Sequence, residues 1–258
     1  MHVHWMEQSE SDVPVVDDWL SDSEAVRMRS FRFAKRRADW RLGRWTAKSA
    51  VAASLNWPTD RLSLKKIEIS QAATGEPEAT IRDRAAKVTI SISHREGIAI
   101  CAVAPGSVKL GCDLEIIETR SDAFIADYFT RKERGLIAQN HGSQRRLLVS
   151  LLWSAKESAL KALHVGLRAD TRSVEVTELD LQGHCYGETD TRSTEDNVSS
   201  ELSNISGANW RALQVLCAGG TDFWGWWQHR NNIVRTMVAN PPPTPPDELL
   251  GTNYGGSD

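Results

Sequence analysis

The sequence predicts an α/β (α+β) fold with two halves of similar order. Three observations support this prediction. The expected elements run helix, strands, helix, strands along the chain. Apolar residues recur at helical spacing in some segments and alternate with polar residues in others. With 258 residues, of which 40% are hydrophobic and 25% charged, the chain is large enough to bury a core. No sequence repeat is obvious between the halves.

The N-terminal half is expected to contain a short first strand, one long helix and a hairpin. Residues 23–55 are predicted to be helical because apolar side chains recur at spacings of three, four and seven. They are Ala34, Ala38, Leu42, Trp45, Ala52 and Leu55. Residues 88–93 alternate as a half-buried strand does, and a short turn leads into the apolar run 98–103. This places His94 at the rim of a hairpin.

The C-terminal half begins after Pro105-Gly106 and repeats this order. Its expected elements are a strand at 108–116, helices at 121–140 and 147–163, and strands at 173–179, 210–217, 223–228 and 233–238. The last two should form a hairpin around Asn231-Asn232. The polar stretch 188–207 is predicted to be a loop or a disordered insertion.

The expected organisation has three parts. Residues 1–106 form an N-terminal α/β half, residues 107–240 form a C-terminal α/β half, and the Pro/Gly-rich residues 241–258 form a disordered tail. The net charge of −3 and the pI near 6.2 argue against a general nucleic-acid binder. The four cysteines form no CxxC pair, and no signal peptide or membrane span is visible. We therefore expect a soluble cytoplasmic protein.

A pair of carboxylates marks the strand at 108–116. Asp113 and Glu115 are two residues apart, so both project from one face of the strand. Gly111 beside them permits close approach of another backbone segment. An isolated pair of this kind is more often a solvated strand edge than a site.

A second cluster lies on the helix at 147–163. Trp153, Glu157 and Lys161 are spaced four apart and share one face, away from the apolar stripe. Taken alone, Glu157 and Lys161 are more simply explained as an ordinary helix salt bridge.

A third element is basic. Nine lysines and arginines lie between Arg27 and Lys48, against Asp39 alone. Four of them form one stripe of the predicted helix, at Arg37, Arg41, Arg44 and Lys48. This imbalance indicates a local anion site, although a solubilising helix face is an equally good explanation. Ser93-His94 at a strand end could also contact phosphate, although a single histidine is more often structural.

Together these motifs resemble the signature of the 4'-phosphopantetheinyl transferases. Gly111-Cys112-Asp113-Leu114-Glu115 is followed by Trp153-Ser154-Ala155-Lys156-Glu157-Ser158-Ala159-Leu160-Lys161, with 44 residues from Asp113 to Glu157. Ser93-His94, Leu42-Gly43-Arg44 with Lys48, and Gly166-Leu167 fit as well, so that the resemblance covers residues 3–240. The length resembles the larger, monomeric surfactin-synthetase-activator type.

The resemblance implies a pseudo-dimer of two α/β halves with coenzyme A bound in the cleft between them. It also implies Mg²⁺-dependent transfer of phosphopantetheine to a serine of an apo acyl, polyketide or peptidyl carrier protein, which releases adenosine 3',5'-bisphosphate. Asp113, Glu115 and Glu157 would hold the metal. Glu157 would act as the base and Lys161 would neutralise the leaving phosphate. The implied coenzyme-binding residues are Arg37, Arg44, Lys48, Ser93, His94, Asp113, Lys156 and Lys161.

One position departs from the family pattern. Thr74-Gly75-Glu76-Pro77 resembles a Gly-Lys-Pro segment, but Glu76 stands at the lysine position and cannot bind phosphate. Either Arg82 or Arg84 compensates, or the coenzyme is held less tightly. By the same analogy, carrier docking is expected at residues 124–133, where Arg131 and Lys132 lie. A silent coenzyme A or carrier-binding module and a Mg²⁺-dependent phosphohydrolase are the alternatives.

Overall fold

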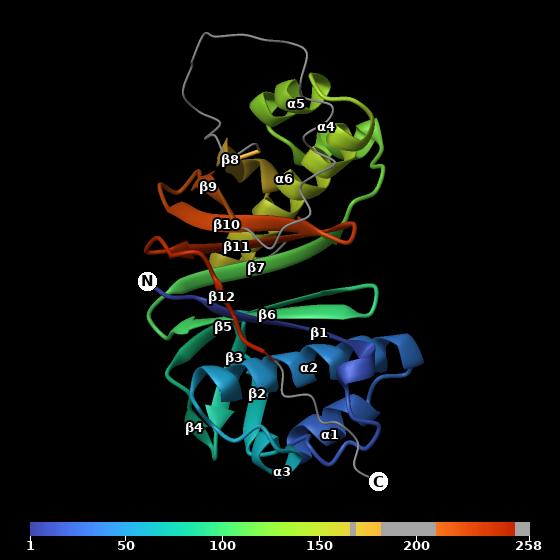
Figure 1. The fold of residues 1–258 in the computed structure, drawn as a ribbon, viewed down its shortest axis with the longest axis vertical. Coiled ribbons are helices and arrows are strands. Elements are labelled where there is room, and N and C mark those ends of the chain that lie inside the picture. Colours follow the sequence, from blue (N-terminus) through green and yellow to red (C-terminus); the bar gives the residue numbers. More distant parts are fainter. Residues whose placement is uncertain (166–168, 182–209, 251–258) are drawn as a thin grey trace. The chain divides into compact units, whose positions relative to one another are not determined.

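A computed structural model describes residues 1–165, 169–181 and 210–250 (Figure 1). The predictions for Gly166-Leu167 and for residues 188–207 lie outside these ranges. The chain divides into two compact units. The N-terminal unit contains His2–Leu110 and the described part of the segment that begins at Pro246, and the C-terminal unit contains Met1 and Gly111–Pro245. In the described residues, no helix is long and apolar enough to cross a membrane.

The N-terminal unit is built on one long helix. The 21-residue helix α2, Ala34–Ser54, packs against β1, β5 and β6 of a sheet ordered β12-β1-β6-β5. A second sheet is ordered β2-β3-β4. The other elements are β1 His4–Ser9, a 3-10 helix Glu10–Asp12, α1 Asp22–Arg29, α3 Arg61–Leu64, β2 Ile67–Gln71, β3 Pro77–Ile81, β4 Arg84–Ala85, β5 Val88–Arg95, β6 Ile98–Pro105 and β12 Asp247–Glu248.

The C-terminal unit has the same kind of architecture. Helix α6, Gly142–Ala162, packs against a sheet ordered β7-β11-β10-β9-β8 (Figure 1). The other elements are β7 Lys109–Ile116, α4 Asp122–Tyr128, α5 Arg131–Ala138, a 3-10 helix Thr171–Ser173, β8 Val174–Leu179, β9 Arg211–Cys217, β10 Asp222–Arg230 and β11 Ile233–Asn240. A methyl group on Gly111 would lie 1.8 Å from the backbone oxygen of Ser158. Glycine therefore lets β7 approach α6 closely.

Two predicted helices are each broken into two. The helix expected at 23–55 is interrupted after Arg29, where Phe31 turns inward and packs on Trp40 with ring centroids 5.8 Å apart. The helix expected at 121–140 is interrupted at Phe129, which is fully buried in an extended conformation. Thr130 then caps α5 by accepting a hydrogen bond from the Glu133 backbone N–H. In both cases the helix ends where a phenylalanine side chain is buried in the core.

The predicted hairpins form. Asn231 and Asn232 have φ of 52° and 61°, as a two-residue turn between β10 and β11 requires. The sequence analysis missed β2, β3 and β4, because these strands are short and β3 begins with Pro77.

The expected disordered tail is wrong for residues 241–250. In the C-terminal unit, Trp226 Nε1 donates a hydrogen bond to Pro243 O over 3.1 Å, and Thr244 N donates to Met1 O over 2.8 Å. In the N-terminal unit, Asp247 and Glu248 pair in parallel with β1. A proline-rich segment carries unpaired carbonyl groups, so that it is readily ordered by donors from elsewhere in the chain.

The two units share an internal framework that the sequence analysis did not detect. In the N-terminal unit, Lys48 of α2 is fully buried, forms an ion pair with Glu24 and donates a hydrogen bond to Trp19 O. In the C-terminal unit, Lys156 of α6 is fully buried, forms an ion pair with Glu133 and donates to a backbone oxygen of β8.

The two glutamates also have equivalent further partners. Glu24 belongs to a capping box that starts at Ser21 and accepts a hydrogen bond from Ile69 N, in β2. Glu133 belongs to a capping box that starts at Thr130 and accepts from the backbone N–H of Val176, in β8. The local sequences match too, since Trp45-Thr46-Ala47-Lys48 corresponds to Trp153-Ser154-Ala155-Lys156. The prediction of two similar α/β halves is confirmed, but a short sequence repeat was overlooked.

Candidate functional site

Strand β7 and helix α6 bring the predicted acidic residues together. Asp113 and Glu115 are 4% and 8% exposed. Lys161 Nζ forms an ion pair with Asp113 Oδ1 over 2.7 Å and donates a hydrogen bond to Cys112 O over 3.0 Å. Glu157 lies one helical turn before Lys161 on the same face. We call Asp113, Glu115, Glu157 and Lys161 the carboxylate cluster.

Two neighbouring groups hold Glu115. Trp153 Nε1 donates a hydrogen bond to Glu115 Oε1 over 3.1 Å, and Arg120 forms an ion pair with Oε2 over 3.2 Å. The Trp153 ring belongs to an aromatic group with Phe124 and Tyr128, at centroid distances of 5.0 and 5.1 Å. The sequence analysis identified Trp153 as sharing a face with Glu157 but missed Arg120, which lies in the loop after β7.

The pKa of Glu157 is raised from 4.5 to about 7. Burial is the largest cause, and the negative charges of Asp113 and Glu115 add to it. Lys161 opposes the shift without cancelling it. The pKa of Lys161 is itself raised, because the neighbouring carboxylates outweigh the effect of its burial. The cluster therefore carries more negative charge than its own lysine neutralises.

The donor chemistry of the cluster suits a hard divalent cation. Oxygen ligands from carboxylates are what Mg²⁺ prefers, and excess negative charge favours a cation. In the described ranges, however, no three acidic, histidine or cysteine side chains are arranged as a preformed metal site. Asp113 and Glu115 instead point oxygens at Lys161, Trp153 and Arg120. Metal binding would thus exchange some of these contacts for metal contacts.

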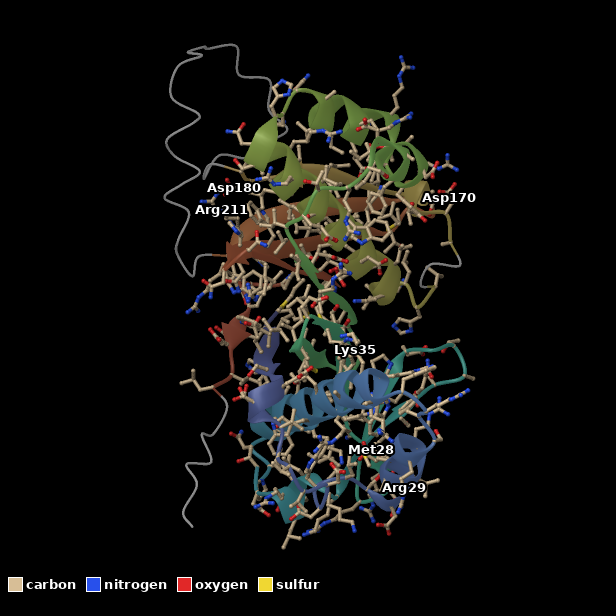
Figure 2. All side chains as sticks on the ribbon, turned by 90° about the vertical axis from the view of Figure 1, so that its right-hand side faces the viewer. Met28, Arg29, Lys35, Asp170, Asp180 and Arg211 are labelled. Carbon is tan, nitrogen blue, oxygen red and sulfur yellow. The ribbon has the colours of Figure 1, made fainter. Side chains whose placement is uncertain are left out.

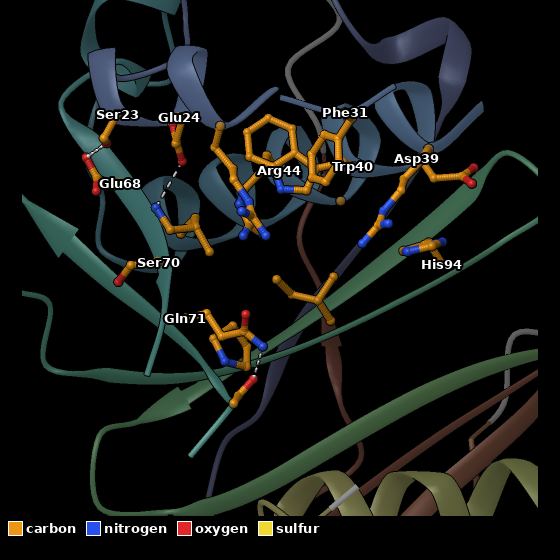
Figure 3. A pocket seen from close by; sticks show the side chains of 17 residues that line it. Ser23, Glu24, Phe31, Asp39, Trp40, Arg44, Glu68, Ser70, Gln71 and His94 are labelled. Atoms are coloured by element: carbon orange, nitrogen blue, oxygen red, sulfur yellow. Dashed lines mark hydrogen bonds between the residues drawn. The ribbon is translucent and has the colours of Figure 1, made fainter. Parts of the chain in front are cut away.

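The N-terminal unit contains a separate pocket of about 810 Å³ (Figure 3). Helices α1 and α2, strands β2 and β5 and the β2–β3 loop supply its walls. Its basic and aromatic lining residues are Arg27, Phe31, Arg36, Trp40, Arg44 and His94. Gly43 belongs to the same wall, and a methyl group there would lie 3.9 Å from the His94 ring.

Arg44 is the least exposed of the three arginines that line this pocket. Its guanidinium lies 5.0 Å from the centre of the Trp40 ring, and its Nε is buried with no hydrogen-bond partner among the described residues. Burial lowers the pKa of Arg44, Glu24 partly opposes this, and Arg27 adds to it. A buried donor without an acceptor is unfavourable, so an anion in the pocket would stabilise this arrangement.

The predicted basic stripe is divided among different environments. Arg44 and His94 line the large pocket, whereas Arg37 lines a different pocket with Arg29 and Arg41. Ser93 is 8% exposed and is not among the residues that line the large pocket.

Lys48 and Lys156 differ from the expectation most clearly. Both were expected to bind the coenzyme, but each ammonium is fully buried against a glutamate. Burial lowers the pKa of each lysine, and the partner glutamate opposes the shift. These contacts indicate that both lysines stabilise the core of their unit.

The Gly75-Glu76-Pro77 segment also borders the large pocket. Gly75 and Pro77 are lining residues, and Gln71 Nε2 donates a hydrogen bond to Gly75 O over 3.0 Å. Glu76 is not a lining residue. Arg82, one of the two expected substitutes for a lysine, lies over the Trp57 ring at 5.1 Å. The pocket instead obtains positive charge from Arg27 and Arg36, which the sequence analysis counted among the nine basic residues but did not select.

Comparison with known proteins agrees with the resemblance for the segment that carries the carboxylate cluster. No curated protein matches the chain. Residues 109–212 match the sequence model of the 4'-phosphopantetheinyl transferase superfamily. This segment begins at β7 and contains Asp113, Glu115, Glu157 and Lys161. The similarity to this superfamily is thus shown for the segment that carries the carboxylate cluster.

Proposed function

We propose that this protein transfers 4'-phosphopantetheine from coenzyme A to a serine of an apo carrier protein, with a divalent metal ion, Mg²⁺, as cofactor. The observation that supports this most strongly is the carboxylate cluster within the superfamily segment. The basic pocket of the N-terminal unit adds support, because coenzyme A is a multiply phosphorylated ligand.

In this proposal Asp113, Glu115 and Glu157 would hold the metal, which when bound would supply positive charge near the pyrophosphate. Glu157, directly or through a water molecule, accepts the proton of the carrier serine. The serine oxygen then forms a bond to the phosphorus of phosphopantetheine, and the bond from that phosphorus to the bridging oxygen breaks. Lys161 places positive charge beside the leaving phosphate. Trp153 and Arg120 orient Glu115.

Arg44 is proposed to bind a coenzyme A phosphate. Replacing Arg44 by glutamine should raise KM for coenzyme A about tenfold or more, because a hydrogen bond to a charged group contributes about 1.5–3 kcal/mol. The turnover number should change much less. Steady-state kinetics with varied coenzyme A and a saturating carrier measure both constants.

The matched control is Arg29→Gln. Arg29 is exposed, donates to Ala25 O and lies outside the large pocket, so its replacement should leave KM for coenzyme A unchanged. Equal effects of the two substitutions would show that Arg44 acts only through general surface charge.

The decisive experiment for the function is incubation with coenzyme A, Mg²⁺ and several apo acyl and peptidyl carrier proteins, read by intact-protein mass. A mass increase of one phosphopantetheine on a carrier is expected. Hydrolysis of coenzyme A without any carrier gain would instead identify a phosphohydrolase. No gain and no hydrolysis would favour a silent binding module.

A further inference from the structure

A small pocket lies on the C-terminal unit, on the sheet face that does not carry α6. Its volume is about 170 Å³, and it shares no residue with the carboxylate cluster. Residues on β10 alternate between the two faces, with Phe223 and Trp227 in the core under α6 and Trp224 and Trp226 on the other side. The lining residues are Glu178, Asp180, Ala212, Leu213, Trp224, Gly225, Trp226, Pro242 and Pro243. We call this the tryptophan pocket.

The strand register explains why this face is hollow. Trp226 pairs with Ala212, and Asp180 N donates a hydrogen bond to Ala212 O over 3.1 Å. These three residues therefore form one row across β10, β9 and the end of β8. Asp180 and Trp226 are two strand spacings apart, which is about 10 Å. In this row only Ala212, with its small methyl side chain, lies between them. The next row on the same face has Glu178 and Trp224 at its ends.

The aromatic wall is held in place. Trp226 Nε1 donates a hydrogen bond to Pro243 O over 3.1 Å. This bond orients the indole ring and holds Pro242 and Pro243 beside it. Pro242 and Pro243 border the pocket on the side of Trp226. The pocket thus has rigid apolar walls, formed by rings that lose little side-chain entropy when a ligand binds.

The opposite wall is acidic and incompletely satisfied. Asp180 Oδ1 is buried and has no hydrogen-bond partner among the described residues. None of the lining residues is basic. Arg211, labelled with Asp180 in Figure 2, donates instead to Leu181 O over 2.5 Å and lies 5.4 Å from the centre of the Trp227 ring. A carboxylate oxygen buried without a donor favours a ligand that brings positive charge.

We propose that the tryptophan pocket binds an organic cation, a guanidinium or a quaternary ammonium group. The cation lies over Ala212, with Asp180 and Glu178 on one side and the faces of Trp224 and Trp226 on the other. Indole faces attract cations through their quadrupole, and the carboxylates add direct attraction. The same chemistry could come from an arginine side chain of a protein partner or from a small quaternary amine.

The test uses the intact protein and the indole N–H signals of Trp224 and Trp226 in ¹H–¹⁵N NMR spectra. The probes are choline, Nα-acetylargininamide, and 3,3-dimethylbutan-1-ol, the neutral isostere of choline. At least one cation should shift both signals saturably, with a dissociation constant in the millimolar range. The neutral isostere should bind about fivefold more weakly or not at all. The tighter cation indicates the source of the natural ligand.

Two variants make the test specific. Asp180→Asn keeps the shape of the pocket but removes a charge, and it should weaken cation binding about fivefold. Asp222→Asn alters an acid at the start of β10, the strand that carries Trp224 and Trp226. Asp222 lies outside the lining residues, so this variant should bind the cations like the unaltered protein. The proposal is overturned if neither cation gives saturable shifts, if the isostere binds as well as choline, or if Asp180→Asn has no effect.

Discussion

Replacing Glu157 by glutamine is expected to lower carrier modification by about 10²–10⁴-fold, the usual contribution of a positioned proton acceptor. Glutamine keeps the size and the helical position of the side chain but cannot accept the serine proton or contribute charge to a metal site. The rate of mass gain on the carrier, at saturating coenzyme A and Mg²⁺, measures the loss.

The same substitution should stabilise the metal-free protein at neutral and alkaline pH. The folded-state pKa of Glu157 is about 7 against an ordinary value of 4.5, so that the folded protein binds the proton more tightly than the unfolded chain does. Stability contributed by this proton is lost as pH rises from 4.5 through 7. Above pH 7, Glu157→Gln should therefore raise the free energy of unfolding by at most about 3 kcal/mol. Below pH 4.5 it should leave the free energy of unfolding unchanged. Urea unfolding in the presence of a chelator, at several pH values, measures this.

Asp222→Asn is the control for both measurements, because Asp222 is an acid at the start of β10, in the same unit but outside the carboxylate cluster and the expected docking segment. It should alter neither activity nor stability. Unimpaired transfer by Glu157→Gln would remove Glu157 from the proposed mechanism. Equal stability of the two proteins at all pH values would show that neither burial nor the neighbouring carboxylates raise the pKa of Glu157 in the folded protein.

Replacing Lys156 by methionine is expected to lower the free energy of unfolding by about 3–5 kcal/mol, because it leaves a buried carboxylate without its cation. Glu133 is 2% exposed and also accepts backbone hydrogen bonds from Thr130 and Val176, so it cannot turn to solvent without losing them. Urea unfolding measured by tryptophan fluorescence gives the change.

The double variant Lys156→Met/Glu133→Gln separates lost charge pairing from lost packing. Glutamine still accepts a backbone hydrogen bond but carries no charge, so the double variant should recover part of the stability. Lys48→Met, the equivalent change in the N-terminal unit, should cost a similar amount. A loss below about 1 kcal/mol for Lys156→Met, together with a raised KM for coenzyme A, would instead favour direct coenzyme binding.

The two parts of the carboxylate cluster could be predicted from local spacing, but only the resemblance to the transferase signature implied that they form one site. A two-residue spacing on a strand and a four-residue spacing on a helix each fix which side chains share a face. Gly111 indicated that the strand and another segment approach closely. The contacts of Glu115 with Trp153 and Arg120 could not be predicted, since they depend on how α6 and the loop after β7 pack.

The basic pocket could be predicted only in part. Arg44 and Lys48 share a helical stripe, yet Arg44 lies beside Trp40 in the pocket and Lys48 is paired with Glu24 in the core. Helical periodicity gives the direction of a side chain from the axis, but it does not identify the segment that covers that direction. Here α1 supplies Glu24, and the predicted single helix at 23–55 concealed the turn that brings α1 against α2.

Because the buried lysine framework occurs twice within one chain, equivalent positions of the two units can carry different side chains, which is not possible in a symmetric homodimer. In a homodimer every substitution appears in both subunits, whereas two copies within one chain diverge separately. Here Glu157 follows Lys156 in one copy, and Ser49 follows Lys48 in the other. Arg44 in turn has Leu152 as its counterpart. At these two positions the C-terminal copy carries the acidic group of the carboxylate cluster and the N-terminal copy carries the basic group of the large pocket.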